Sequence, residues 1–599
     1  MTNLDKLEKI FPECITEALD DDGKICRAVN FERLKQILSG ERAAGKEAYE
    51  FNFVGKKNAE LEAHRPTDKT LRPALDESRD FNATENLYVE GDNLEALKIL
   101  QESYLGKVKM IYIDPPYNTG NDFIYRDDFA QNADDFDAAA GNLDADGNRL
   151  NLQLNRESRG RFHSDWCAMI FSRLLIAKNF LSDDGVIFIS IDDHEQANLK
   201  KICDEVFGEK NFVANIIWKK KTNGNNMGFI PPVHDFIVVY CKDISSLTPF
   251  ALPLSEEYLN SKYANPDNDP RGAWTTTDLS ANHKGPHFAI TNPKTGEKFF
   301  PPQGRYWVFN EAEVLRRIDD GRIIFGKSGD SRPVQKVFAA ERNLSQKPDT
   351  WFDKQGYNGD ATTELAEIIG RKIFDSPKPK TLIKYILKFA TGEDSIVMDF
   401  FSGSATTAHA VMELNATDGG HRKFIMIQIG DETPANSEAR RAGYEKISDI
   451  GKERIRRAGD KLKAEHPALD TGFRVFKVSP SNFKPLPTDL QTLLTFVDNI
   501  EPDRNEYDLF FGTLLSKGMT LDKKFAAEEV DGFKVLSADG GEILACFDEK
   551  ILAATFRKLA ERKPRKIFFR DSSFASSADK INALEFIKNF APDTEVTVL

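Results

Sequence analysis

Cysteine is scarce in this chain, with only six in 599 residues. No two have the spacing of a metal-binding pair and no CxxC occurs; they are Cys14, Cys26, Cys167, Cys203, Cys241 and Cys546. We therefore expect reduced, mostly buried thiols, no disulfide framework and no metal. A run of about 18 apolar residues is also lacking, and the charged N-terminus has no apolar centre like that of a signal peptide. These absences predict a cytoplasmic protein that does not enter membranes.

A nucleotide-binding motif is missing as well. Because the chain has no GxGxxG, a dinucleotide fold is disfavoured. The net charge of −14 argues against a nucleic acid partner for the chain as a whole. Binding depends on local patches, however, and basic residues cluster at Lys219, Lys220 and Lys221. Composition therefore leaves the question of DNA binding open.

The chain is too long for one hydrophobic core, because single cores stop growing at about 250–300 residues. Strands that alternate with helices predict an α/β fold with a doubly wound, mostly parallel sheet. We expect an inserted β-rich block and a small C-terminal α/β domain. The predicted parts are an N-terminal helical or extended region, the first half of the core, the β-rich block, the second half of the core and the C-terminal domain, at residues 1–85, 86–244, 245–370, 371–484 and 485–599.

Hydrophobic patterns predict the individual elements. Strands are expected at residues 87–89, 108–114, 185–192, 234–242, 395–401 and 423–429. Helices are expected at residues 4–19, 31–38, 94–100, 166–181, 195–207, 381–390 and 405–414. Residues 127–160 are polar, acidic and rich in Asn, which indicates a long loop or insertion. A hairpin turn is expected at residues 292–296.

The first motif with chemical content is Asp114-Pro115-Pro116-Tyr117, directly after a predicted buried strand. Ligands of open α/β sheets bind beyond the carboxyl ends of the strands, where this tetrapeptide lies. Two prolines fix the backbone and lack N–H donors, so carbonyl groups stay free beside a carboxylate and an aromatic ring. Such a cluster suits a planar group that carries an amine. An isolated Asp-Pro-Pro is more often a strand-ending turn, but the context VKMIYIDPPYNTG favours the functional interpretation.

The second motif is DFFSGSATTAHAV, from Asp399 to Val411. A predicted strand runs into the small residues Ser402, Gly403, Ser404 and Ala405 and then into a helix. Small residues allow a ligand to approach the backbone closely, and the N-terminus of the helix offers free N–H groups. Taken alone, the motif indicates a nucleotide-like ligand or simply a tight turn.

Together these motifs resemble the amino-methyltransferases that act on DNA, in the group whose catalytic motif precedes the cofactor motif. The sequence resembles more closely the modification subunits of Type III restriction systems. The resemblance covers nearly the whole chain and rests on NLYVEGDNLEALKIL, IYIDPPYNTG, LSDDGVIFISIDDHE, FDSPKPKTLIKYIL, DFFSGSATTAHAV and ISDIGKERIRRAG. It implies a Rossmann-like methyltransferase sheet and transfer of a methyl group from S-adenosylmethionine to the N6 amine of adenine, with no metal needed.

The resemblance also implies roles for the first motif. Asp114 and the Pro115 carbonyl would hold the adenine amine in a turn fixed by Pro115 and Pro116, and Tyr117 would stack on the base. The base must leave the duplex, at a cost of a few kcal/mol. A stacking ring recovers about 1–3 kcal/mol of that cost. Most of the rate would come from positioning.

For the cofactor, the resemblance implies that Asp399 lies near the methionine amine and Lys378 near its carboxylate. The turn that would line the cofactor contains Phe401, Ser402 and Gly403. The acid that usually binds the ribose hydroxyls aligns with Gln428, with Asp431 and Glu432 close by. The second glycine of the family motif is Ala405 here, and its methyl group would crowd the cofactor or be accommodated by a slight shift.

Two alternatives stay open at this point. One is a cytosine-N4 DNA methyltransferase, a family that tends to have Ser at the position of Asp114. The other is a DNA-binding module with a decayed cofactor site, suggested by Ala405 and disfavoured by the intact Asp114 and Tyr117. We interpret His194 as a loop histidine and His409 as a packed helix histidine.

Partners follow from the same reasoning. Double-stranded DNA is the expected substrate, and Lys219, Lys220 and Lys221 either contact its phosphates or form a solvated face. The block at residues 245–370 is expected to select the DNA sequence, because nothing in it looks catalytic. The C-terminal domain is expected to join two copies into a homodimer. A restriction (helicase-nuclease) subunit is a further candidate partner.

Overall fold

The computed structural model describes most of the chain, in two compact units, Met1–Val54 and Gly55–Leu599. The described residues are 14–19, 25–30, 51–120, 123–125, 152–154, 162–224, 229–326, 329–342, 345–374, 376–485 and 499–599, together with residues 7 and 34. Of the loop expected at residues 127–160, only 152–154 lie within the described part. They form β7 (Leu152–Leu154), which pairs with β6 (Phe123–Tyr125).

The first unit contains a β-hairpin where the sequence predicted a helix. Strand β1 (Ile15–Leu19) pairs antiparallel with β2 (Ile25–Val29). The helix expected over residues 4–19 is therefore wrong in its last third. The β-branched side chains of Ile15 and Thr16 fit a strand better than a helix. The helix expected at residues 31–38 lies almost wholly outside the described residues.

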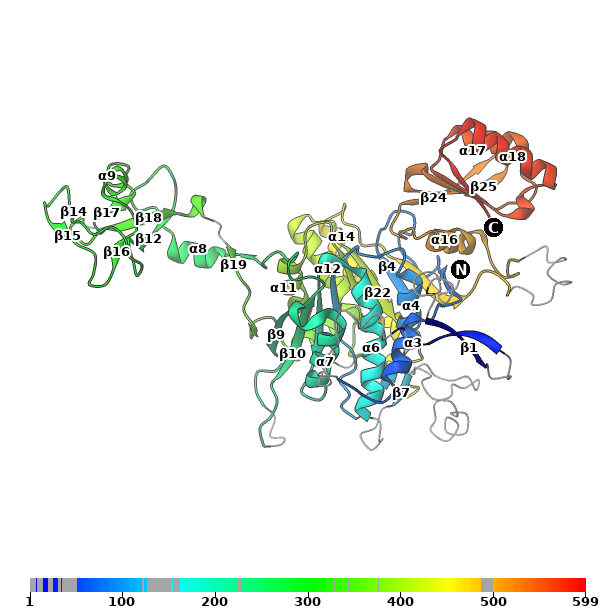
Figure 1. The fold of residues 1–599 in the computed structure, drawn as a ribbon, viewed down its shortest axis with the longest axis horizontal. Helices are drawn as coiled ribbons and strands as arrows, with labels where there is room; N and C mark the ends of the chain where they lie inside the picture. Colours follow the sequence, from blue (N-terminus) through cyan, green and yellow to red (C-terminus); the bar gives the residue numbers. More distant parts are fainter. Residues whose placement is uncertain are drawn as a thin grey trace. The chain divides into compact units, whose positions relative to one another are not determined.

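A ten-stranded sheet forms the centre of the second unit (Figure 1). Its strand order is β20, β9, β10, β8, β5, β21, β22, β4, β23, β3. The bounds are β3 (Lys69–Pro73), β4 (Leu87–Glu90), β5 (Val108–Ile113), β8 (Leu181–Ile191), β9 (Phe212–Lys219), β10 (His234–Cys241), β20 (Trp351–Phe352), β21 (Ile396–Asp399), β22 (Lys423–Gln428) and β23 (Arg474–Pro480). From β8 through β23 each strand is parallel to its neighbour, whereas β9, β10 and β3 introduce antiparallel pairs. The predicted mostly parallel sheet is confirmed.

The strand order brings the two halves of the core together. Strand β5, from the first half, lies beside β21, from the second half, with Ile111 opposite Met398. The carboxyl ends of parallel strands meet at one edge of a sheet, where ligands of α/β folds bind. The residues that follow β5 and β21 therefore share this edge, which we call the active edge.

Two groups of helices pack with the sheet (Figure 1). The first group is α3 (Lys56–His64), α4 (Asn93–Leu100), α6 (Phe162–Phe180) and α7 (Gln196–Cys203), and the second is α10 (Asn358–Ile369), α11 (Lys380–Ala390), α12 (Thr406–Asp418) and α14 (Ile447–Glu465). Helix α4 begins as predicted, because the Asp92 side chain accepts a hydrogen bond from the Glu95 N–H at 3.1 Å. The apolar core of this unit includes Tyr112, Phe188, Leu387 and Met426.

Short antiparallel pairs fill residues 252–346. They are β11 (Leu252–Pro253) with β19 (Ser345–Gln346), β12 (Trp274–Asp278) and β17 (Ile323–Ile324) with β18 (Val334–Phe338), β13 (Ser280–Ala281) with β16 (Tyr306–Trp307), and β14 (Ile290–Thr291) with β15 (Lys298–Phe299), the expected hairpin. Helices α8 (Glu256–Lys262) and α9 (Glu311–Asp319) accompany them. The region has a hydrophobic cluster of its own, which includes Leu279, Trp307 and Phe325. Strand β20 and helix α10, which follow it, pack with the large sheet and its helices.

The end of the chain has a second, five-stranded sheet. Its order is β24 (Phe525–Val530), β25 (Phe533–Ala538), β26 (Ile543–Cys546), β27 (Lys566–Phe569) and β28 (Glu595–Val598), accompanied by α16 (Glu506–Ser516), α17 (Ala553–Glu561) and α18 (Ser577–Phe590). Phe556, Ile567 and Phe569 pack in its core. The predicted small α/β domain is thus present, and the apolar residues of its central helix and strand are buried within it.

The structure can be compared with two expectations from the sequence, the lack of a membrane-spanning helix and the state of the cysteines. No helix among the described residues is long and apolar enough to cross a membrane. The cysteines whose side chains are described are free and buried, as the sequence predicted: Cys14, Cys167, Cys203, Cys241 and Cys546.

Candidate active site

The tetrapeptide Asp114-Pro115-Pro116-Tyr117 begins directly beyond β5, at the active edge. We call it the catalytic turn. Its second proline is fixed by α6, because the Trp166 indole N–H donates to the Pro116 carbonyl at 2.7 Å. Asn118, which follows, adopts a left-handed conformation with φ of 62°, a region that Asn tolerates better than most residues. Residues outside the tetrapeptide therefore help to hold the turn in place.

Glu195 is the main anchor of this turn, and the sequence analysis missed it. Its buried carboxylate accepts hydrogen bonds from Asn118 Nδ2 at 2.5 Å and Asn198 Nδ2 at 2.7 Å, and its Oε1 lies 2.6 Å from His163 Nδ1. The sequence carried no clear signal for it, because Glu195 lies four residues beyond the end of β8 and its partners Asn118 and His163 are distant in the sequence. His194 beside it is half-exposed, with Nδ1 2.9 Å from Asp192, and fits our interpretation as a loop histidine.

The Asp114 carboxylate has one engaged oxygen and one available oxygen. Lys378 Nζ lies 2.6 Å from Asp114 Oδ2 and 5.0 Å from the centre of the Tyr117 ring. Among the described residues, neither the buried Asp114 Oδ1 nor the buried Tyr117 hydroxyl has a hydrogen-bond partner. Burial first, and then the charge of Asp114, raise the pKa of Tyr117 well above its usual range. The turn thus offers an acceptor oxygen beside a neutral aromatic ring.

Asp399 organises the turn after β21, which we call the cofactor turn. Its Oδ1 accepts from the Phe401 N–H at 3.1 Å and its Oδ2 from the Thr407 hydroxyl at 2.6 Å. The side chain is buried, and burial raises the pKa of Asp399 to about 7, with a smaller contribution from the charge of Asp114. An opposite charge nearby would favour the ionised form. The site therefore fits a ligand that carries a cationic group.

Gln428 holds the same turn from the neighbouring strand. Its Oε1 accepts from the Gly403 N–H at 2.7 Å. Gly403 has φ of 50°, in the left-handed region that favours glycine. The Ser402 hydroxyl is buried and has no hydrogen-bond partner among the described residues. Gln428, which the resemblance places at the ribose, thus has a structural task in the turn as well, while Ser402 offers a polar atom to a ligand.

Ala405 precedes α12 with φ of 58° and ψ of 40°, also left-handed. A β-carbon built on Gly451 of α14 would lie 3.4 Å from the Ala405 methyl group. The methyl group therefore faces a position on α14 that has no side chain. This geometry supports accommodation of the methyl group without loss of the cofactor site. His409, one turn further, is buried at 5% exposure, and burial lowers its pKa well below the usual range, as expected of a packed histidine.

The comparisons with known proteins agree with these two turns. A family model for DNA methylases matches residues 108–437, from β5 to beyond β22. The Type III restriction-modification enzyme StyLTI Mod subunit of Salmonella typhimurium is 35% identical over 79% of this chain and 73% of its own length. The EcoP15I Mod subunit of Escherichia coli and the EcoPI Mod subunit of Escherichia phage P1 are each 32% identical, over 98% of this chain and 95% of their own length.

The chain belongs to the Type III Mod subunits. It is a DNA methyltransferase. The three lysines predicted to bind DNA differ in their surroundings in this Mod subunit. Lys220 is paired with the buried Asp235, so its ammonium group is engaged within the protein. Lys219 is half-buried and Lys221 is exposed. Contact with phosphate stays a prediction for these two and is not favoured for Lys220.

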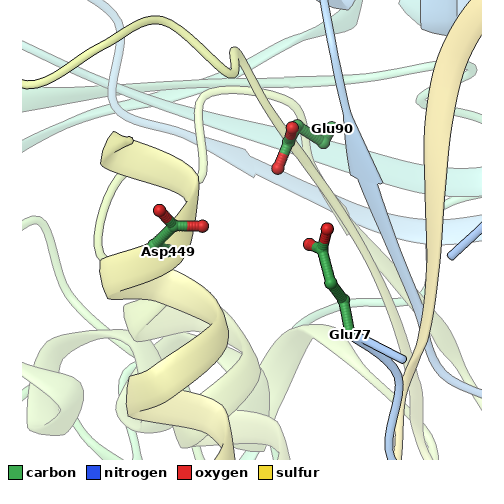
Figure 2. Close-up of side chains that lie close together, drawn as sticks. All are labelled: Glu77, Glu90 and Asp449. Carbon is green, nitrogen blue, oxygen red and sulfur yellow. The ribbon is translucent and has the colours of Figure 1, made fainter. Parts of the chain in front are cut away.

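Three carboxylates of the Mod subunit converge near β4, those of Glu77, Glu90 and Asp449 (Figure 2). Lys452 Nζ reaches all three, at 2.9 Å from Glu90 and 3.1 Å from Asp449. Burial alone would raise the pKa of Glu90, but hydrogen bonds and charge from Lys446 and Lys452 outweigh it and lower the pKa to about 2. The cluster is an ion-pair network that joins β4 to α14.

Proposed function

We propose that this chain transfers a methyl group from S-adenosylmethionine to the N6 amine of adenine in double-stranded DNA. One observation carries the proposal: the Asp114 carboxylate, at the active edge, keeps a buried oxygen without a partner among the described residues, beside the Tyr117 ring and next to the cofactor turn. This arrangement matches a planar base with an amine at its edge. It needs no metal for methyl transfer.

The target base has to leave the duplex before its amine can reach Asp114. Extrusion costs a few kcal/mol, and stacking on Tyr117 returns about 1–3 kcal/mol. Asp114 Oδ1 and the Pro115 carbonyl then accept the two N–H groups of the amine. These bonds hold the nitrogen in place and leave its lone pair available for reaction. Lys378 keeps the other oxygen of Asp114 fixed, so that positioning supplies much of the rate.

The cofactor turn fits S-adenosylmethionine, which supplies a methyl group on a positively charged sulfur. Asp399 is suited to the amine of the methionine part, because its buried carboxylate gains from a cationic partner. Ser402, Gly403 and Phe401 would line the ligand, and Ala405 would begin the helix behind it. The resemblance places Lys378 at the methionine carboxylate, a role it would combine with its contact to Asp114. It places Gln428 at the ribose, a role that this residue would combine with its contact to Gly403.

A methyl-transfer assay tests this function. The protein is incubated with labelled S-adenosylmethionine and genomic DNA that lacks the modification, and the labelled base is identified after digestion. We expect N6-methyladenine. Label in N4-methylcytosine would favour the cytosine enzyme. Absence of both label and cofactor binding would favour a DNA-binding module with a decayed cofactor site. Either result contradicts the proposal.

We further propose that residues 245–370 choose the DNA sequence. The β-rich region has its own hydrophobic cluster and lies between the two halves of the core in the chain. Base recognition depends on contacts in the grooves, which no motif encodes. Exchange of the block with that of a relative should change the methylated sequence. An unchanged sequence in the chimaera would refute the assignment.

We also propose that the C-terminal domain joins two copies of the chain into a homodimer, and that the chain associates with a restriction subunit. The apolar residues of α17 and β27 are packed inside the domain, but its surface retains exposed apolar side chains at Leu552, Ile581 and Phe590. Truncation at about residue 480 should give a monomer in light scattering. A truncated chain that stays dimeric would place the contact elsewhere.

A further inference from the structure

The hairpin of β9 and β10 extends from the sheet at the active edge. Strand β10 begins at His234 and runs antiparallel to β8, with Phe236 opposite Ile191, so its first residues lie where β8 and β5 end. The arms of the hairpin continue beyond the sheet, because the N–H groups of Lys220 and Lys221 both donate to the Val233 carbonyl, at 2.9 and 3.3 Å. The loop therefore projects from the edge that holds the catalytic turn.

Two apolar side chains of this loop are entirely in solvent. Phe229 is 108% exposed and Ile230 is 89% exposed, the two highest values among the large hydrophobic residues in the described part of the chain. Single exposed apolar residues are ordinary. An adjacent aromatic and β-branched pair with this exposure forms a small apolar patch, which is typical of an interaction site.

The loop holds these side chains outward on a stiff support. Two prolines, Pro231 and Pro232, follow the pair and fix the backbone. A β-carbon built on Gly224, in the opposite arm, would lie 2.9 Å from Pro231 Cβ. The arms therefore pack so closely that glycine is the residue that fits at position 224.

The base of the hairpin is linked to the catalytic turn by charge. Asp235, the second residue of β10, is buried and paired with Lys220. Its charge contributes, after burial and the charge of Asp114, to the raised pKa of Tyr117. Lys221, just above, is exposed and offers a cation to a phosphate. The hairpin thus carries an exposed apolar pair and an exposed cation at the edge that holds the catalytic turn.

We propose that Phe229 and Ile230 form a wedge that enters the DNA duplex at the target adenine and occupies the space that the extruded base leaves. The partner is double-stranded DNA, which the enzyme methylates. Apolar wedges of Phe and Ile unstack base steps in other DNA-bending proteins, at a cost that the contacts made by the protein repay. The inference rests on the proposed extrusion of adenine and adds the residues that hold the duplex open.

The test uses the full-length double variant Phe229→Ala/Ile230→Ala. Its matched control is Leu61→Ala/Leu105→Ala, which removes two exposed apolar side chains from α3 and from the turn before β5. The substrate is a short duplex that contains the methylated sequence, with either a matched base pair or an abasic site opposite the target adenine. We expect the wedge variant to methylate the matched duplex at least about tenfold more slowly, because the cost of opening is no longer repaid.

On the duplex with the abasic site, the wedge variant should methylate at the wild-type rate, since this adenine is already unpaired. With 2-aminopurine at the target position, the wild-type enzyme should raise its fluorescence and the variant should not. Equal methylation rates of the wedge variant and the wild-type enzyme on the matched duplex would overturn the proposed wedge. An equal loss of rate on both duplexes would do so too, as would dissociation of the variant into monomers in light scattering. Failure of the wild-type enzyme to methylate adenine in any of these duplexes would instead refute the proposed function.

Discussion

The catalytic turn and the cofactor turn lie side by side on the sheet, yet different groups hold them in place. Outside the catalytic turn, Trp166 donates to the Pro116 carbonyl and Glu195 binds the side chain of Asn118, which follows the turn, while Asp114 keeps an oxygen without a partner among the described residues. In the cofactor turn, the candidate ligand residues Asp399 and Gln428 make the bonds that shape it. In the catalytic turn, the residue that would take part in the reaction is therefore distinct from most of the residues that hold the turn. In the cofactor turn, the same residues would do both, and substitutions can test this difference.

The largest expected effect is that of Asp114→Ala. Methylation should slow by about 10³-fold, equivalent to about 4 kcal/mol, because the acceptor for the amine is lost. The lost bond to Lys378 should lower the free energy of unfolding by only about 1.5–3 kcal/mol. Single-turnover methylation and thermal melting of the same sample measure both quantities. Asp193→Ala, an exposed carboxylate beyond β8, is the control. A variant that melts early but methylates at a normal rate while folded would show that Asp114 is a structural residue.

The next effect is that of Glu195→Ala, which removes the anchor without touching the reacting groups. A displaced turn should slow single-turnover methylation by about 10²-fold, while the affinity for S-adenosylmethionine stays the same. His163→Ala, which removes the exposed partner of Glu195, should be nearly normal. Parallel losses of rate and of cofactor affinity in Glu195→Ala would show that the two turns are not independent.

Gln428→Ala should affect structure and function together. The Gly403 N–H loses its acceptor, which should lower the free energy of unfolding by about 1–3 kcal/mol. Cofactor affinity should fall by about tenfold, because a distorted turn binds less well. Thermal melting and calorimetric titration of S-adenosylmethionine measure these changes. A normal affinity for S-adenosylmethionine together with a lowered free energy of unfolding would show that Gln428 holds the turn without binding the cofactor. The contrast between the two turns would then be lost.

Cofactor affinity should also depend on pH through Asp399, whose pKa is about 7. The ionised carboxylate is the form that attracts a cationic group, and a protonated one must release its proton on binding. The affinity should therefore be constant above about pH 7 and fall by about tenfold for each pH unit below it. Titrations at pH 6 and pH 8 measure the change, and Asp399→Asn should abolish it. An equal slope in the Asn variant would assign the titration to another group.

The smallest effect is expected for Ala405→Gly. Glycine relieves the left-handed backbone, which should offset the loss of a buried methyl group to within about 1 kcal/mol. Cofactor affinity should change less than about threefold, because the methyl group faces α14. A large gain in affinity would mean that the methyl group does crowd the cofactor.

The sequence predicted the large sheet because its strands are buried apolar runs and its helices have clear apolar faces, as in residues 108–113 and 381–390. It predicted both turns because each follows such a strand. It did not predict Glu195 or Asp235, because their importance arises from neighbours that are distant in sequence, such as Asn118 and Lys220. The N-terminal strand β1 was mistaken for a helix because a five-residue strand with a partner six residues later carries little pattern of its own.

The most direct test of the contrast is a calorimetric titration of S-adenosylmethionine into the Asp114→Ala variant. If the catalytic turn handles the base and the cofactor turn handles the methyl donor, the variant should bind the cofactor with an affinity within about threefold of the wild-type value, although it no longer methylates DNA. Loss of cofactor binding in this variant, with its melting temperature little changed, would contradict the division of labour between the two turns.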